Sequence, residues 1–139
     1  MASRRCTYKG ITFDSLAEAG YFIHLLDQEK KGLISDIELQ PSWELFADGP
    51  PDGRIKIGKY TADFRYLDLE RDEFVTVDVK GQVPGTRTLK NGTKKRSAGG
   101  QGWTAFRLRC KILEANYGIT VEVVPGAVYT ELAKKAGVK

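Results

Sequence analysis

The 139-residue sequence has few of the residues on which several large classes of protein depend. Cys6 and Cys110 are its only cysteines and His24 its only histidine, which argues against a disulfide framework, a zinc site and Ser-His or Cys-His catalysis. No apolar run approaches the roughly 20 residues of a membrane span, and the basic N-terminus lacks the apolar core of a secretory signal. We therefore expect a cytoplasmic protein with no membrane partner.

Acidic residues are missing altogether between Asp78 and Glu114. The basic residues of that interval are Lys80, Arg87, Lys90, Lys94, Lys95, Arg96, Arg107, Arg109 and Lys111. Residues 82–102 also lack apolar periodicity, so we interpret them as a mobile basic loop at about 82–102. Charge of one sign suits a polyanion such as DNA, although a solvated insertion is the alternative. The candidate DNA-binding residues are Arg87, Lys90, Lys94, Lys95, Arg96, Arg107 and Lys111.

The remaining composition, 41% hydrophobic and 29% charged, is typical of one globular domain covering residues 1–139. Apolar periodicity, caps and turn residues predict an order of helix, three strands, helix and strand, followed by a short terminal helix. The expected elements are helix 15–31, strands 33–40, 60–66 and 74–80, helix 103–117, strand 119–124 and helix 127–135. We therefore expect a mixed α/β fold.

Residues 60–81 alternate with a period of two on both sides of a charged segment, which predicts an antiparallel hairpin. A turn at residues 70–71 would give three apolar cross-strand pairs, Ala62 with Val79, Phe64 with Val77, and Tyr66 with Val75. The same register sets Asp63 opposite Asp78 on the other face, with Lys80 two residues further along. Facing carboxylates repel unless a cation lies between them, and Mg²⁺ is commonly held by one or two carboxylates.

Glu18 is a candidate third carboxylate, contributed by the first helix. Taken alone it is better explained by structure, because Ser15-x-x-Glu18 is the pattern of a capping box. Asp63, Asp78 and Lys80, each taken alone, are likewise better explained as a surface ion-pair cluster. Together, however, these residues supply carboxylates for one or two cations and a positive charge near the nucleophile, as metal-dependent phosphodiester hydrolysis requires.

The order of Glu18, Asp63 within Ala-Asp-Phe, and Asp78 to Gly81 (Asp-Val-Lys-Gly) resembles the PD-(D/E)xK nuclease superfamily. It is similar in particular to small phage proteins of the endonuclease I type, which resolve Holliday junctions. A phage-encoded family shares its Ser-Leu-x-Glu, Leu-Gln-Pro, Ala-Asp-Phe and Asp-Val-Lys-Gly blocks. The resemblance spans roughly residues 11–124 and implies a restriction-endonuclease-like core.

The resemblance also implies roles for individual residues. Glu18, Asp63 and Asp78 would bind Mg²⁺ or Mn²⁺, and Lys80 would position or activate the attacking water. Glu38 is the candidate for an extra metal-binding acid that the endonuclease I type carries. Two positions depart from the pattern, because Ala62 replaces the usual Pro and Asp78 stands where many relatives have Glu.

The function expected from these residues and this resemblance is a metal-dependent DNA endonuclease that resolves branched DNA or Holliday junctions in phage recombination or replication. Such an enzyme would be a homodimer in the cytoplasm of the host cell, with Mg²⁺ or Mn²⁺ as cofactor. One alternative is a nickase, flap nuclease or repair nuclease acting on duplex or single-stranded DNA. Another is a non-catalytic DNA-binding protein with a nuclease-like fold.

Overall fold

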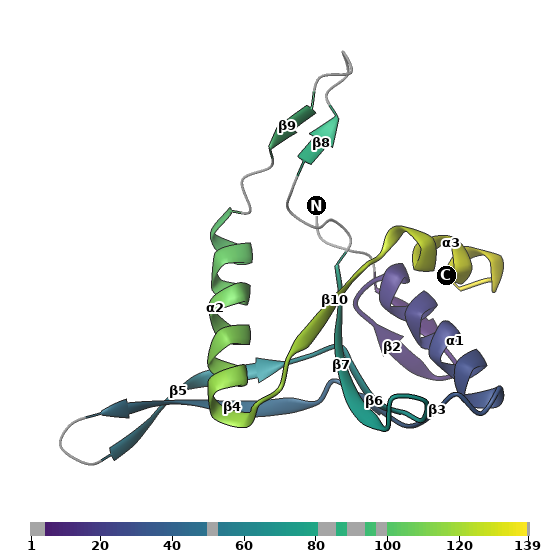
Figure 1. The fold of residues 1–139 in the computed structure, drawn as a ribbon. Helices are drawn as coiled ribbons and strands as arrows, with labels where there is room; N and C mark the ends of the chain where they lie inside the picture. Colours follow the sequence, from purple (N-terminus) through teal and green to yellow (C-terminus); the bar gives the residue numbers. More distant parts are fainter. Residues whose placement is uncertain (1–4, 50–52, 81–85, 89–93, 97–99, 139) are drawn as a thin grey trace. The chain divides into compact units, whose positions relative to one another are not determined.

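The computed structural model of this protein contains both helices and strands, with a sheet of parallel and antiparallel strands, so the mixed α/β fold is confirmed (Figure 1). The structure describes residues 5–49, 53–80, 86–88, 94–96 and 100–138. Its contacts divide the chain into two compact units. The first comprises Met1–Pro41, Thr61–Gly81 and Val121–Lys139, and the second comprises Ser42–Tyr60 and Gln82–Thr120.

The first unit contains a four-stranded sheet in the order β10-β7-β6-β3. Its strands are β3 (Ile34–Leu39), β6 (Phe64–Asp68), β7 (Glu73–Lys80) and β10 (Val121–Pro125). β6 pairs antiparallel with both β3 and β7, whereas β10 pairs parallel with β7. The predicted order of helix, three strands, helix and strand is present as α1, β3, β6, β7, α2 and β10.

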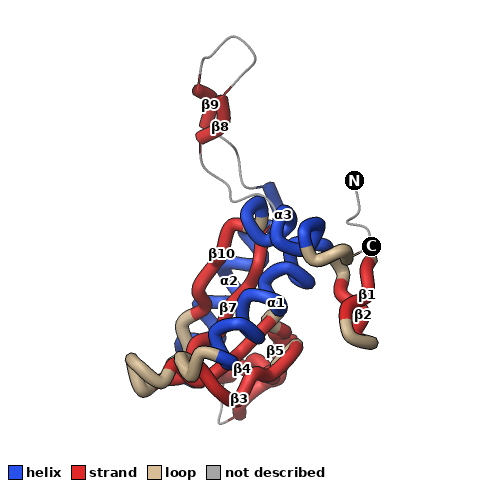
Figure 2. The backbone as a smooth tube through the Cα atoms, turned by 90° about the vertical axis from the view of Figure 1, so that its right-hand side faces the viewer, coloured by secondary structure: helices blue, strands red, loops and turns tan. Residues whose placement is uncertain are grey.

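Helices α1 (Leu16–Lys30) and α3 (Ala127–Lys135) lie side by side in the first unit, as Figures 1 and 2 both show. α1 begins where predicted, because the Ser15 hydroxyl accepts a hydrogen bond from the Glu18 N–H at 3.1 Å. It ends at Lys30, and the stop signal is Gly32 just beyond it, whose φ of 78° only glycine adopts readily. A short two-stranded sheet, β1 (Cys6–Tyr8) with β2 (Ile11–Phe13), precedes α1.

The predicted register of the central hairpin is confirmed. Phe64 lies opposite Val77 and Tyr66 opposite Val75. The face that carries these residues is buried together with α1, and its core residues include Phe22, Phe64, Val75, Val77 and Val79. Because side chains alternate along a strand, Asp78 and Lys80 lie on the other face.

Two strand predictions were wrong in detail. β3 does not alternate as expected, because its register shifts between Ser35 and Glu38, and Asp36 adopts a φ of 55°. An extra residue at this bulge reverses the faces of the residues that follow it. The high density of apolar residues at 119–124 predicted a strand in the interior of the sheet, but β10 is at one end of the sheet order.

The second unit contains β4 (Ser42–Gly49), β5 (Gly53–Thr61, whose last residue falls in the first unit), β8 (Thr86–Thr88), β9 (Lys94–Arg96) and α2 (Gly100–Tyr117). β4 pairs with β5, and β8 pairs antiparallel with β9. The segment at 82–102 was expected to be a loop throughout, yet Thr86–Thr88 and Lys94–Arg96 form the short strands β8 and β9. α2 also begins at Gly100 rather than at Trp103.

Asn116 and Tyr117 attach the end of α2 to β4. The Asn116 side chain accepts from the Phe46 N–H at 2.7 Å and donates to the Phe46 carbonyl at 3.1 Å. The Tyr117 hydroxyl donates to the Glu44 carbonyl at 2.7 Å. Tyr117 was expected in the buried stripe of the helix, but it is 43% exposed, whereas Leu113 is fully buried.

No helix within the described residues has both the length and the apolar character needed to cross a membrane.

Candidate functional site

Asp63 and Asp78 lie together at the point where β6 begins and β7 approaches its end. The Asp63 N–H donates to Asp78 Oδ1 at 3.1 Å, and the Val79 N–H donates to Asp63 Oδ2 at 2.7 Å. The Asp78 carboxylate therefore accepts from the backbone of Asp63, and the Asp63 carboxylate accepts from the residue that follows Asp78. These two hydrogen bonds hold the two acids side by side.

Burial raises the pKa of both aspartates above the ordinary value for an aspartate. Two effects oppose it. The positive charge of Lys80 and the backbone hydrogen bonds lower the pKa of each group, but they do not outweigh the loss of hydration. Lys80 is thus close enough to influence both carboxylates, as the sequence predicted.

Glu18 of α1 joins this pair. Burial raises its pKa to about 7, and the negative charges of Asp63, Asp14 and Asp78 add to the shift. A hydrogen bond from the backbone of Asp14 acts in the opposite direction. The structure therefore brings Glu18, Asp63, Asp78 and Lys80 into one electrostatic neighbourhood, although they come from a helix and two strands.

Asp14 is an acid that the sequence analysis missed. Its negative charge raises the pKa of both Glu18 and Asp63. Its own side chain is 66% exposed and lies 3.7 Å from the Arg5 guanidinium. The signal was available in the sequence, because Asp14 directly precedes the N-cap residue Ser15, where the chain turns into α1.

Glu38, the candidate for an additional metal-binding acid, does not affect the charge of this group. It is exposed on β3, directly opposite Arg65 on β6. Because Ile37 and Leu39 pack against the core, Glu38 lies on the other face of the sheet, as predicted. It is nevertheless not among the charges that shift the pKa of Glu18, Asp63 or Asp78.

The described residues contain no group of three or more His, Cys, Asp or Glu side chains that could hold a metal ion. Fewer protein ligands suffice for Mg²⁺, which often binds one or two carboxylates and keeps water and substrate oxygens in its other positions. Asp63 and Asp78 provide such a pair, and all donors here are hard oxygen atoms. The residues present therefore fit a magnesium or manganese ion held by two aspartates.

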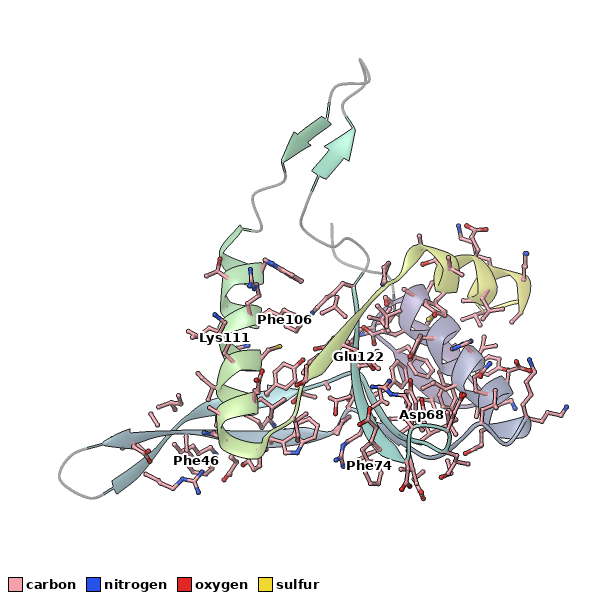
Figure 3. The ribbon with its side chains drawn as sticks, in the orientation of Figure 1. Phe46, Asp68, Phe74, Phe106, Lys111 and Glu122 are labelled. Atoms are coloured by element: carbon pink, nitrogen blue, oxygen red, sulfur yellow. The ribbon has the colours of Figure 1, made fainter. Side chains whose placement is uncertain are left out.

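The candidate DNA-binding residues lie in the second unit. Arg107 and Lys111 are exposed on α2, and Figure 3 labels Lys111 there. Arg87 is in β8, and β9 consists of Lys94, Lys95 and Arg96. Lys90 falls outside the described residues.

A family model described as "Protein of unknown function (DUF1064)" matches residues 1–117. The chain belongs to the DUF1064 family. The matched span includes Glu18, Asp63, Asp78 and Lys80, whereas β10 and α3 follow it in the chain. No curated protein and no solved structure matches the sequence.

Proposed function

We propose that this protein is a DNA endonuclease that depends on Mg²⁺ or Mn²⁺. The observation that carries the proposal is the pair of aspartates, Asp63 and Asp78, held side by side by cross-strand hydrogen bonds. Lys80 lowers the pKa of both aspartates, and both aspartates raise the pKa of Glu18. A surface ion-pair cluster does not account for this site, because one buried carboxylate, Asp78, and two partly buried ones, Glu18 and Asp63, outnumber the cation beside them.

Asp63 and Asp78 would hold the divalent cation, and Glu18, predicted from the sequence as a third ligand, would add negative charge close to it. When bound, such a cation polarises the scissile phosphate and lowers the pKa of the attacking water. The Lys80 ammonium lies beside the aspartates, where it can contact the water or a phosphate oxygen and stabilise developing negative charge. Glu18, with a pKa of about 7, can change its protonation state near neutral pH.

We further propose branched DNA, including Holliday junctions, as the substrate, a homodimer as the active state and the host cell cytoplasm as the location. Two subunits would allow paired cuts in the two strands of a junction. The basic residues Arg107 and Lys111 support an interaction with phosphates, because both are exposed on α2. The resemblance to the endonuclease I type supports the choice of branched substrate.

The deciding experiment compares cleavage of labelled four-way junction, flap, duplex and single-stranded DNA in Mg²⁺, Mn²⁺ or EDTA. The parent should cut in either metal and not in EDTA. Asp78→Asn and Lys80→Ala should each lose at least about 100-fold in cleavage rate, a cost comparable to that of losing one electrostatic contact to the transition state. Lys135→Ala, at an exposed position of α3 in the same unit, serves as the control.

Calorimetric titration with Mn²⁺ gives a reading that does not depend on activity. The parent should bind the ion, and Asp78→Asn should bind it much more weakly. Undiminished cutting by both Asp78→Asn and Lys80→Ala would refute the proposed site.

A non-catalytic DNA-binding protein is the second candidate. It is favoured by one observation, the lack of a three-residue metal-binding group within the described residues. DNA binding by the parent, combined with no Mn²⁺ binding and no cleavage of any of the four substrates, would establish it.

A further inference from the structure

Four aromatic rings form a continuous row in the second unit. Trp43 of β4 stacks on Tyr60 of β5 with ring centroids 6.4 Å apart, and Tyr60 lies 6.2 Å from Phe106 of α2. Phe106 in turn lies 5.2 Å from Trp103. Tyr60, in the middle, is only 4% exposed, whereas both tryptophans at the ends are partly exposed. Trp103 is therefore a partly exposed ring that packs against Phe106, which in turn packs against the buried ring of Tyr60.

Trp103 lies in the first turn of α2 and has a basic neighbour on the helix surface. Arg107 follows it by four residues, a spacing that places two side chains next to each other, and Arg107 is exposed. Lys111 continues this basic line one turn further, and it leaves α2 on a different side from Phe106 (Figure 3). An aromatic ring and a row of cations thus share one side of the helix.

The N-terminal end of α2 adds to the positive field around Trp103. The first turn of the helix contains no acidic residue. A helix of 18 residues presents a partial positive charge at this end, formed by backbone N–H groups without partners inside the helix. An anionic group next to Trp103 would therefore be attracted both by the helix end and by Arg107.

We propose that Trp103 stacks against an unpaired base of the DNA substrate, while Arg107 and the N-terminal end of α2 hold the adjoining phosphate. The inference rests on the proposed function in taking DNA as the ligand. Every base offers a flat face for stacking, but only an unpaired base is free to turn onto a protein ring. The site would thus select DNA with unpaired bases, such as flaps, open junction centres and single strands, over continuous duplex.

The first test measures the affinity of the full chain for fluorescein-labelled oligothymidylate and for a duplex of the same length, both in EDTA. Trp103→Ala should weaken single-strand binding by about 5- to 150-fold, the range that stacking of one base provides. Duplex binding should change less than about twofold, and Trp103→Phe should retain most of the single-strand affinity. Leu108→Ala, exposed on the same helix, should change neither affinity.

The intrinsic fluorescence of the protein gives a second reading. The chain has two tryptophans, so Trp43→Phe leaves Trp103 as the only one. Oligothymidylate should quench the fluorescence of Trp43→Phe strongly, because the base lies against the emitting ring. Trp103→Phe, in which only Trp43 emits, should show little quenching.

These two measurements distinguish a role of Trp103 in base stacking from a purely structural role in the packing of the second unit. Equal losses for single strand and duplex in Trp103→Ala, or no loss for either, would overturn the proposal. So would quenching of equal size in the two single-tryptophan variants. Cleavage assays test the proposed endonuclease function separately from base stacking. A protein that stacks bases on Trp103 need not cut DNA, and a protein that cuts DNA need not stack bases on Trp103.

Discussion

At the scale of single residues, Glu18 has two roles to reconcile. Its backbone N–H is bound by the Ser15 hydroxyl at the start of α1, while its carboxylate lies near Asp63 and Asp78. The capping role predicted for Glu18 and its predicted closeness to Asp63 and Asp78 are therefore compatible. The backbone of Glu18 takes part in the cap, and its side chain belongs to the acidic group.

Glu18 should make the stability of the protein depend on pH when no divalent cation is present. Its pKa is about 7 in the folded chain, against an ordinary value of 4.5, so the folded state binds its proton more tightly than the unfolded state. The corresponding stability is complete below pH 4.5 and is lost as the pH rises through about 7. The difference corresponds to at most roughly 3 kcal/mol.

Urea denaturation of Glu18→Gln in EDTA checks this prediction. Because glutamine resembles the protonated acid, the variant should be more stable than the parent at pH 8 and equal to it at pH 4. Glu29→Gln, exposed on the same helix, is the matched control and should follow the parent throughout. A stability difference that stays constant from pH 4 to pH 8 would contradict the assigned pKa.

At the scale of elements, the contact between α1 and α3 depends on one glycine. A Cβ added to Gly20 would lie 1.7 Å from the Tyr129 carbonyl oxygen and 2.5 Å from the Tyr129 carbonyl carbon. Both atoms belong to the backbone of α3, so they cannot turn aside as a side chain would. Gly20 is therefore what allows the two helices to approach this closely.

Gly20→Ala should destabilise the protein by about 1–3 kcal/mol, the usual cost of an overpacked core. This result is opposite in sign to the usual effect of the substitution, since alanine in a helix is normally about 1 kcal/mol better than glycine. Thermal unfolding measures the difference. Gly58→Ala is the control, because no atom lies within 4 Å of an added Cβ there; a Gly20→Ala variant as stable as this control would refute the close contact.

At the scale of the whole molecule, charge is distributed unevenly along the chain. The formal net charge is +4, yet the interval from residue 79 to residue 113 contains no acid. DNA binding that relies on this interval releases condensed counterions, so the logarithm of the binding constant should fall linearly with the logarithm of the salt concentration. The slope reports the number of phosphates contacted.

Arg107→Gln should reduce that slope by about 1 and weaken binding to all DNA sequences alike, as loss of one phosphate contact does. Binding titrations at several salt concentrations measure the slope. Lys134→Gln removes the same charge from α3, where Lys134 lies 3.6 Å from Glu131, and should leave the slope unchanged. Equal reductions in both variants would show that total charge, rather than the charge of α2, determines binding.

The sequence alone determined the features that depend on neighbouring residues. The register of β6 and β7 followed from their alternating pattern and short turn, because a slip by one residue would expose the whole apolar face. The ends of α1 followed from Ser15 and Gly32, which act within one turn of the chain. Asp63 and Asp78 were consequently predicted as neighbours, and they are.

Tertiary structure decided the features that depend on contacts between distant segments. The bulge in β3 turned Ile37 and Leu39, rather than Leu33 and Ser35, toward the core together with Ile34. β10 took a position at the end of the sheet. The turn into α1 brought Asp14 close enough to affect Glu18 and Asp63. Local sequence patterns specify helix caps and the registers of hairpins. The position of a bulge, the order of strands in a sheet and the contacts of a helix depend on how distant segments pack together.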